Sequence, residues 1–147
     1  LHGRPVVGGH AEAEALVTDE TISGWGGVDP SSGTIIETRH ELSGVCFTDK
    51  VLVFHGAKGS SGWSSIFHTT RLAGTAPAAM VYNETTTKVA LGAVVTRVPA
   101  VTDLDRDPTE VIDTGDWVAV DGDAGTVTVT KRSDGAGESA AVGPASE

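Results

Sequence analysis

The stretch VLVFHGAKGSSGWSSIF, residues 51–67, limits the possible folds more than any other part of the chain. An apolar run of strand length, residues 51–54, leads through glycines and paired serines into residues 64–72, whose pattern predicts a helix that stops at Gly74. The order of strand, glycine-rich turn and helix places the polar groups of the turn where a ligand can reach them. This turn is therefore the first candidate for a functional site.

Short apolar segments separated by turn residues recur along the rest of the chain. Alanines at 11, 13 and 15 alternate with glutamates at 12 and 14, which predicts a half-buried strand. Residues 22–37 and 103–116 are rich in turn formers and predict long loops. The predicted strands are two about the turn at 8–9, then 34–37, 45–54 with a turn at 48–49, 76–82, 98–101, and a terminal hairpin of 117–120 and 125–130; a second helix is predicted at 86–95.

Mixed strands with two short helices indicate an α+β fold, with a three-layer β/β/α domain as its specific form. A chain of 147 residues fits one domain that can bury a core without disulfides. We assign residues 1–130 to this domain. The remainder, KRSDGAGESAAVGPASE at 131–147, is almost without large apolar residues and predicts a disordered C-terminal tail.

Charge and cysteine content exclude several classes of function. The formal net charge of −10 argues against a nucleic-acid surface, which needs a basic stripe. No apolar run is long enough to span a membrane, and no signal-peptide pattern is present, so we expect a cytoplasmic protein without membrane partners. Cys46 is the only cysteine, so the chain cannot itself supply the several thiolates of an iron–sulfur cluster or a cysteine-based zinc site. Its apolar neighbours predict that Cys46 is buried.

The turn after the first apolar run allows three interpretations. In the first, Ser60 or Ser61 only caps the following helix, and the glycines only turn the chain. The second is a phosphate-binding P-loop, but only two residues separate Gly56 from Gly59 where that motif needs four before its final Gly-Lys, so the motif is absent. In the third, a serine hydroxyl is a catalytic group.

Simple energetics limit the third interpretation. The helix N-terminus directs N–H groups and partial positive charge at the turn, and Lys58 adds a full charge, so an anion is favoured there. A helix N-terminus contributes about 0.3–2 kcal/mol, whereas about 1.4 kcal/mol moves a pKa by one unit. That is too little to ionise a serine near neutral pH, and the sequence shows no His–Asp relay. A serine base would therefore need its substrate, or a metal on another chain, to acidify the proton that it removes.

Four segments occur in an order that is informative together: ISGWGGVDPSSGTIIE, VLVFHGAKGSSGWSSIF, GTAPAAMV, and ALGAVV followed by VPAV. They resemble the small subunit of the aconitase X group, from Gly3 to about Val120. The resemblance implies a swivelling β/β/α domain of the aconitase swivel type. In archaeal relatives the subunit pair is a phosphomevalonate dehydratase, and in bacterial relatives a cis-3-hydroxy-L-proline dehydratase. The large subunit of the heterodimer carries the cysteines and the iron or iron–sulfur centre, so no cofactor is expected on this chain.

The resemblance also implies which residues form the site. The first serine after the Lys-Gly pair, Ser60, is the proton acceptor, and no metal ligand is expected on this chain. Trp63 stands where a smaller residue is commoner, which puts the identity of the substrate in doubt. The expected substrate-binding residues are Lys58, Gly59, Ser61 and Gly62 in the turn, and Gly27 and Asp29 in the GGVDP loop.

Each of these assignments has a simpler alternative. Asp29 precedes a proline and can serve only to form a turn. Trp25 and Trp63 either shield the site from water or fill a core that has few aromatics. Residues 103–107, DLDRD, lack the glycine and final glutamate of a calcium loop and are expected to be a solvated loop. For the whole chain, the alternative is a non-catalytic module that binds an anion or a protein through the KGSS turn.

Overall fold

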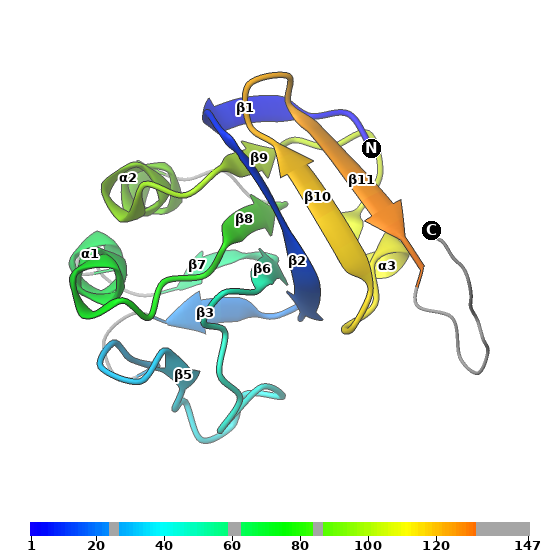
Figure 1. The fold of residues 1–147 in the computed structure, drawn as a ribbon. Helices are drawn as coiled ribbons and strands as arrows, with labels where there is room; N and C mark the ends of the chain where they lie inside the picture. The colour runs from blue at the N-terminus through cyan, green and yellow to red at the C-terminus, as the bar shows by residue number, and fades with distance from the viewer. Residues whose placement is uncertain (24–26, 59–62, 84–86, 132–147) are drawn as a thin grey trace.

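The computed structural model describes residues 1–23, 27–58, 63–83 and 87–131 (Figure 1). This part contains three helices, one more than the two predicted. The additional helix is short, is capped by Asp107 and has Pro108 as its first residue. None of these helices has the length and hydrophobicity needed to cross a membrane. The elements are β1 (Arg4–Val7), β2 (His10–Val17), β3 (Thr21–Ser23), β4 (Val28–Asp29), β5 (Thr34–Ile35), β6 (Val51–Phe54), β7 (Gly56–Lys58), α1 (Trp63–Ala73), β8 (Ala79–Tyr82), α2 (Thr87–Thr96), β9 (Ala100–Thr102), α3 (Pro108–Val111), β10 (Trp117–Asp121) and β11 (Thr126–Thr130).

Seven strands form one sheet in the order β1-β9-β8-β6-β2-β10-β11. The central pairs β2–β6, β6–β8 and β8–β9 are parallel, and the flanking pairs β1–β9, β2–β10 and β10–β11 are antiparallel. Helices α1 and α2 follow β7 and β8 and lie together on one side of the sheet, while β10 and β11 fold over the other side (Figure 1). Strands β1 and β2 flank the predicted turn at Gly8–Gly9, but they pair with different neighbours instead of with each other.

The two outer strands of this sheet are brought together by the residues that precede β1. Leu1 and Val127 exchange two backbone hydrogen bonds of 2.9 Å, and the Gly3 N–H donates to the Gly125 carbonyl at 2.7 Å. His2 and Thr126 form an isolated antiparallel bridge between these bonds. The sheet therefore curls until its first and last members meet, and encloses an interior.

Strict alternation along the central strands produces two separate cores. In β6, Val51 and Val53 face the interior of the curled sheet, whereas Leu52 and Phe54 face the helices. Strand β8 divides its residues in the same way, with Ala79 and Val81 on one side and Met80 and Tyr82 on the other. The VLVF run is apolar throughout because both of its faces are covered. This arrangement is the layered β/β/α architecture that the sequence indicated.

The predicted loop at 22–37 contains three short strands, β3, β4 and β5. Of the predicted 34–37 strand, only Thr34–Ile35 is extended in a sheet. Strand β7 occupies residues that were predicted to begin the glycine turn. Neither β3 nor β7 was predicted, because both adjoin glycine-rich segments without a strand pattern. The two strands pair with each other although they are more than thirty residues apart in the chain.

The prediction of a strand over 45–54 interrupted by a turn at 48–49 is confirmed for the turn and for residues 51–54. It is wrong for residues 45–47, where only an isolated bridge between Cys46 and Thr34 forms, and the prediction that Cys46 is buried is also wrong. Strand β6 begins only at Val51, after a turn in which the Lys50 N–H donates to the Phe47 carbonyl at 3.1 Å. Cys46 is exposed, with Sγ 3.5 Å from the Ser32 carbonyl oxygen. The next residue, Phe47, takes the core position instead and stacks on Phe67 with ring centroids 5.7 Å apart.

Candidate active site

A two-stranded parallel ribbon pairs the strands that lead into the two sequence motifs. Strand β3 pairs with β7 in the register Thr21↔Gly56, Ile22↔Ala57 and Ser23↔Lys58. The GWGG segment continues from Ser23, and the GSSG segment continues from Lys58. Because parallel strands end at the same edge, the two segments start from adjacent residues. The structure thus pairs the residues from which the two motifs start, Ser23 and Lys58, which are 35 positions apart in the sequence.

Most residues of the predicted site lie outside the described part of the chain. Ser60, Gly59, Ser61 and Gly62 belong to this group, and their assignment stays a prediction. The backbone of Lys58 is described as the last residue of β7. Trp63, which follows the segment directly, is the first residue of α1.

Helix α1 favours negative charge at the end that adjoins the GSSG segment. It has 11 residues, carries no acidic residue in its first turn, and has Arg71 in its last turn. The first N–H groups of a helix have no partner within the helix and carry partial positive charge. This end of α1 therefore favours an anion that lies close to it.

The side chain of Asp29 forms hydrogen bonds within a local turn. Its carboxylate accepts hydrogen bonds from the Ser31 N–H at 3.0 Å, the Ser31 hydroxyl at 2.7 Å and the Ser32 hydroxyl at 3.0 Å. These bonds, above all the one from the Ser31 hydroxyl, lower the pKa of Asp29 below its ordinary value. The geometry agrees with the turn-forming interpretation, and contact between Asp29 and a substrate stays a prediction.

Gly27 has a steric role at the end of β3. A Cβ atom at this position would lie 2.4 Å from the Ser23 carbonyl oxygen, so any other residue would push the two backbones apart. Its carbonyl accepts a hydrogen bond of 2.9 Å from the Ile36 N–H. Gly27 therefore lets the GGVDP loop fold back closely against the β3–β7 ribbon.

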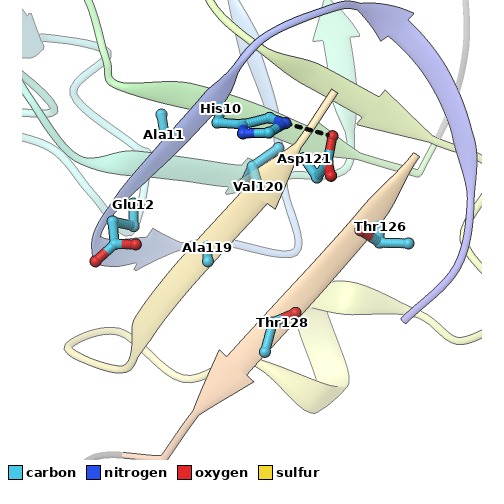
Figure 2. Close-up of a pocket in the computed structure, with 8 residues that line it drawn as sticks. All are labelled: His10, Ala11, Glu12, Ala119, Val120, Asp121, Thr126 and Thr128. Atoms are coloured by element: carbon cyan, nitrogen blue, oxygen red, sulfur yellow. Dashed lines mark ion pairs between the residues drawn. The ribbon is translucent and has the colours of Figure 1, made fainter. Parts of the chain in front are cut away.

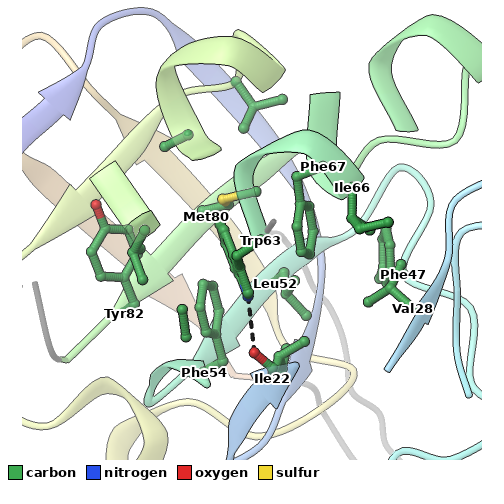
Figure 3. Packing of buried hydrophobic residues seen from close by; sticks show 14 of the residues in the cluster. Ile22, Val28, Phe47, Leu52, Phe54, Trp63, Ile66, Phe67, Met80 and Tyr82 are labelled. Atoms are coloured by element: carbon green, nitrogen blue, oxygen red, sulfur yellow. Dashed lines mark hydrogen bonds between the residues drawn. The ribbon is translucent and has the colours of Figure 1, made fainter. Parts of the chain in front are cut away.

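Trp63 is part of the core and does not face solvent. It is 1% exposed, and its indole Nε1–H donates to the Ile22 carbonyl at 2.9 Å (Figure 3). The ring stacks on Phe67 with centroids 4.3 Å apart and on Phe54 at 6.1 Å. Of the two interpretations of this tryptophan, the structure supports core filling, and it adds a hydrogen bond that the sequence did not reveal.

A polar cluster at the ends of β6 and β8 was missed by the sequence analysis. Asn83 Nδ2 donates to Asp107 Oδ1 at 3.0 Å and lies 3.4 Å from His55 Nδ1. The Thr109 hydroxyl donates to the same Asp107 oxygen at 2.6 Å and is the main reason why the pKa of Asp107 is lowered. The Asp-Pro pair at 107–108 is a helix-start signal that could have revealed the capping role.

A second polar group lines a cavity of about 470 Å³ on the outer face of β2, β10 and β11 (Figure 2). His10 Nε2 lies 3.0 Å from Asp121 Oδ1 and 3.5 Å from Asp123 Oδ2. Asp121 also accepts hydrogen bonds from the Ala124 and Asp123 N–H groups, which lower its pKa. The Asp121 carboxylate thus stabilises the β10–β11 turn, whereas the Asp123 carboxylate accepts a hydrogen bond of 3.3 Å from the Gly9 N–H, between β1 and β2.

The residues of this chain do not fit an iron–sulfur centre. Such a cluster is held by several thiolates, and Cys46 is the only cysteine of the chain. Its sulfur lies on an exposed loop and contacts the Ser32 carbonyl. Any cluster that serves this protein must therefore be held elsewhere.

Comparisons with known proteins agree with this geometry. A sequence model of the family described as aconitase X swivel domain matches residues 1–129. The phosphomevalonate dehydratase small subunit of Methanocella arvoryzae is 41% identical over 130 residues, which cover 88% of this chain and 98% of that protein. The protein of the same name from Methanosarcina mazei is 38% identical over 133 residues, covering 90% and 92%. The crystal structure of Thermococcus kodakaraensis aconitase X in its holo-form has a TM-score of 0.84 at 35% identity, covering 89% of this chain and 98% of that one.

Proposed function

The chain belongs to the aconitase X swivel-domain family, as the sequence motifs predicted, and on this premise we propose that it is the small subunit of a two-chain dehydratase. The partner is an aconitase X large subunit, which carries the iron or iron–sulfur centre. The proposed substrate is phosphomevalonate, because the relatives named above are phosphomevalonate dehydratase small subunits that align over nearly their whole length.

The observation that supports a catalytic role best is the β3–β7 ribbon. It starts the GWGG and GSSG segments from the paired residues Ser23 and Lys58, and in the sequence the GSSG segment leads directly to the first residue of α1. A site that removes a proton from carbon needs a base, and it also needs positive charge to stabilise the anion that forms. Helix α1 supplies partial positive charge, and Lys58 supplies a cationic side chain by its identity.

Ser60 is the proposed base. It lies two residues after the end of β7 and three residues before α1 begins. Its Oγ, as the alkoxide, would accept the proton of the substrate carbon and become a neutral hydroxyl, while Ser61 and Gly62 would offer backbone N–H groups to the substrate. About 0.3–2 kcal/mol from the helix N-terminus does not ionise a serine by itself, so groups of the partner subunit must take up the Ser60 hydroxyl proton and also make the substrate proton more acidic.

The alternative function, a non-catalytic anion- or protein-binding module, makes use of the same helix end. It is weaker because it gives no reason for two loops to start from one ribbon. Activity of the purified pair separates the two proposals. The assay compares this chain alone, the large subunit alone, and both together, on phosphomevalonate and on cis-3-hydroxy-L-proline.

We expect turnover only of phosphomevalonate and only by the pair. The chain alone should fold, show no dehydratase activity and retain no stoichiometric iron in metal analysis. Turnover by this chain alone would contradict the two-subunit proposal. A pair that is fully loaded with metal and inactive on both substrates would favour the binding module.

A further inference from the structure

Both ends of the segment that contains Ser60 are attached to two consecutive residues of β3. At the first end, the backbone of Lys58 pairs with Ser23. At the second end, the Trp63 indole donates to the Ile22 carbonyl at 2.9 Å. Four residues, 59–62, lie between these two attachment points. The residues that flank this segment are therefore held to β3, one by backbone pairing and the other by a side-chain hydrogen bond.

The indole is held in place by packing on several sides. Its ring stacks on Phe67, one turn further along α1, and faces Phe54 of β6 (Figure 3). Helix α2 approaches it through Gly92, where a Cβ atom would lie 2.2 Å from Trp63 Cζ3 and 2.5 Å from Cε3. A glycine in a helix interior is otherwise unfavourable. The size of the indole explains why a glycine stands at position 92, since a larger residue would collide with the ring.

We propose that Trp63 is a positioning residue for the active-site segment, with Gly92 as its matched partner on α2. This inference rests on the proposed dehydratase function. The indole hydrogen bond fixes the first residue of α1 to the strand that precedes the GWGG loop, so that Lys58 and Trp63, which flank the GSSG segment, are both joined to β3. A base must be placed to within a fraction of an ångström, because a displacement of about 1 Å can reduce a rate about a hundredfold.

Trp63→Phe removes the hydrogen bond and keeps an aromatic ring between Phe54 and Phe67. In the assembled enzyme we expect kcat to fall about tenfold or more, with KM changed less than about threefold, because substrate binding depends less on the position of the base. Trp117→Phe is the matched control. That tryptophan, 46% exposed on β10, also donates its indole N–H, at 3.2 Å to Glu12, but on the outer face of the sheet. It should leave both constants unchanged.

Gly92→Ala tests the steric partner. The added methyl group must displace the indole, so this variant should lose kcat as Trp63→Phe does. In the double variant, the smaller phenyl ring vacates the space that the methyl group needs. The double variant should therefore be no slower than Trp63→Phe alone, a non-additive result that a simple loss of stability at two sites does not give.

Hydrogen exchange of the indole N–H groups gives a readout that does not depend on activity. In ¹⁵N-tryptophan-labelled protein the Trp63 signal, assigned by its loss in Trp63→Phe, should exchange far more slowly than that of Trp117 and should accelerate in Gly92→Ala. Equal rates for the two signals would overturn the attachment itself. An active wild-type pair whose Trp63→Phe variant is folded and keeps kcat within twofold would overturn the positioning role. An inactive wild-type pair with a slow Trp63 signal would instead overturn the proposed function and leave the attachment intact.

Discussion

Lys131 Nζ lies 2.6 Å from Oδ2 of Asp116, whose side chain is only 3% exposed. The amine also reaches Asp113 at 3.0 Å and the Val111 carbonyl at 3.0 Å. Desolvation opposes the charged amine, but hydrogen bonds and charge from Asp116 and Asp113 outweigh it and raise the pKa of Lys131. The residue assigned to the start of the tail is thus bound to the domain.

Lys131→Met should lower the free energy of unfolding by about 1–3 kcal/mol, because a buried carboxylate loses a charged hydrogen-bond donor. Urea unfolding of the isolated chain at neutral pH measures this. Lys50→Met is the control: Lys50 forms a solvent-exposed pair with Glu14 at 3.6 Å, so its loss should cost no more than about 1 kcal/mol. Equal effects of the two substitutions would contradict the special role of Lys131.

Tyr82 offers a test that depends on pH. Its hydroxyl is buried and finds no hydrogen-bond partner among the described residues, and burial raises its pKa to about 12. Tyr82→Phe should leave stability unchanged or increase it by up to about 1 kcal/mol, since no bond is lost. The raised pKa means that the folded state resists ionisation, so wild-type stability should fall as pH rises from about 10 towards 12. The phenylalanine variant should lack this part of the alkaline loss; identical profiles would contradict the burial of the phenol.

Asp29 should titrate below the ordinary range of an aspartate. Ser31→Ala removes the largest stabiliser of its charged form, so the pKa of Asp29 should rise towards the ordinary value, as seen by carboxyl ¹³C NMR. The sign of the linkage follows from the lowered pKa. The turn contributes stability above the unfolded pKa and loses this contribution as pH falls through the folded value. A Ser43→Ala control, on a different exposed turn, should not move the signal.

Ser60→Ala and Ser61→Ala separate chemistry from capping in the assembled enzyme. Loss of the proposed base should reduce kcat about a hundredfold or more with a smaller change in KM. Folding and subunit pairing should persist, because a lost N-cap costs only about 0.5–2 kcal/mol. Ser61→Ala should reduce kcat less, since alanine keeps the backbone N–H. Full kcat in Ser60→Ala with an inactive Ser61→Ala would move the base by one residue.

The elements that the sequence predicted best are those with a complete local pattern. Strands β10 and β11 are dense in β-branched residues and lie within one residue of the predicted hairpin, and α1 ends directly before the predicted stop at Gly74. For β6 and β8 the prediction holds for the apolar residues but extends too far towards the N-terminus. Helix α3 was missed because it spans only four residues and is defined by the Asp107 cap. Cys46 was misplaced because apolar neighbours do not tell which of two adjacent residues faces the core, and Phe47 does.

The two motifs of the site could be predicted from the sequence, but the pairing of the strands that lead into them could not. The motifs could be read from residue types alone. That β3 and β7 pair in parallel depends on a long-range contact between Ile22 and Ala57, for which a glycine-rich sequence gives no periodic signal. The hydrogen bond from Trp63 to the Ile22 carbonyl could not be predicted from the sequence either, because every residue carries the same backbone carbonyl group.

Strands β6 and β8 each give alternate residues to both cores, and this has a consequence for how the molecule opens. A fluctuation that exposes either core must also expose the side chains that β6 and β8 contribute to it. The amides of Leu52, Val53, Met80 and Val81 should therefore exchange with solvent only through global unfolding, whereas the β4–β5 pair can open separately. The chain should accordingly unfold as one cooperative unit, with its two layers melting at the same temperature.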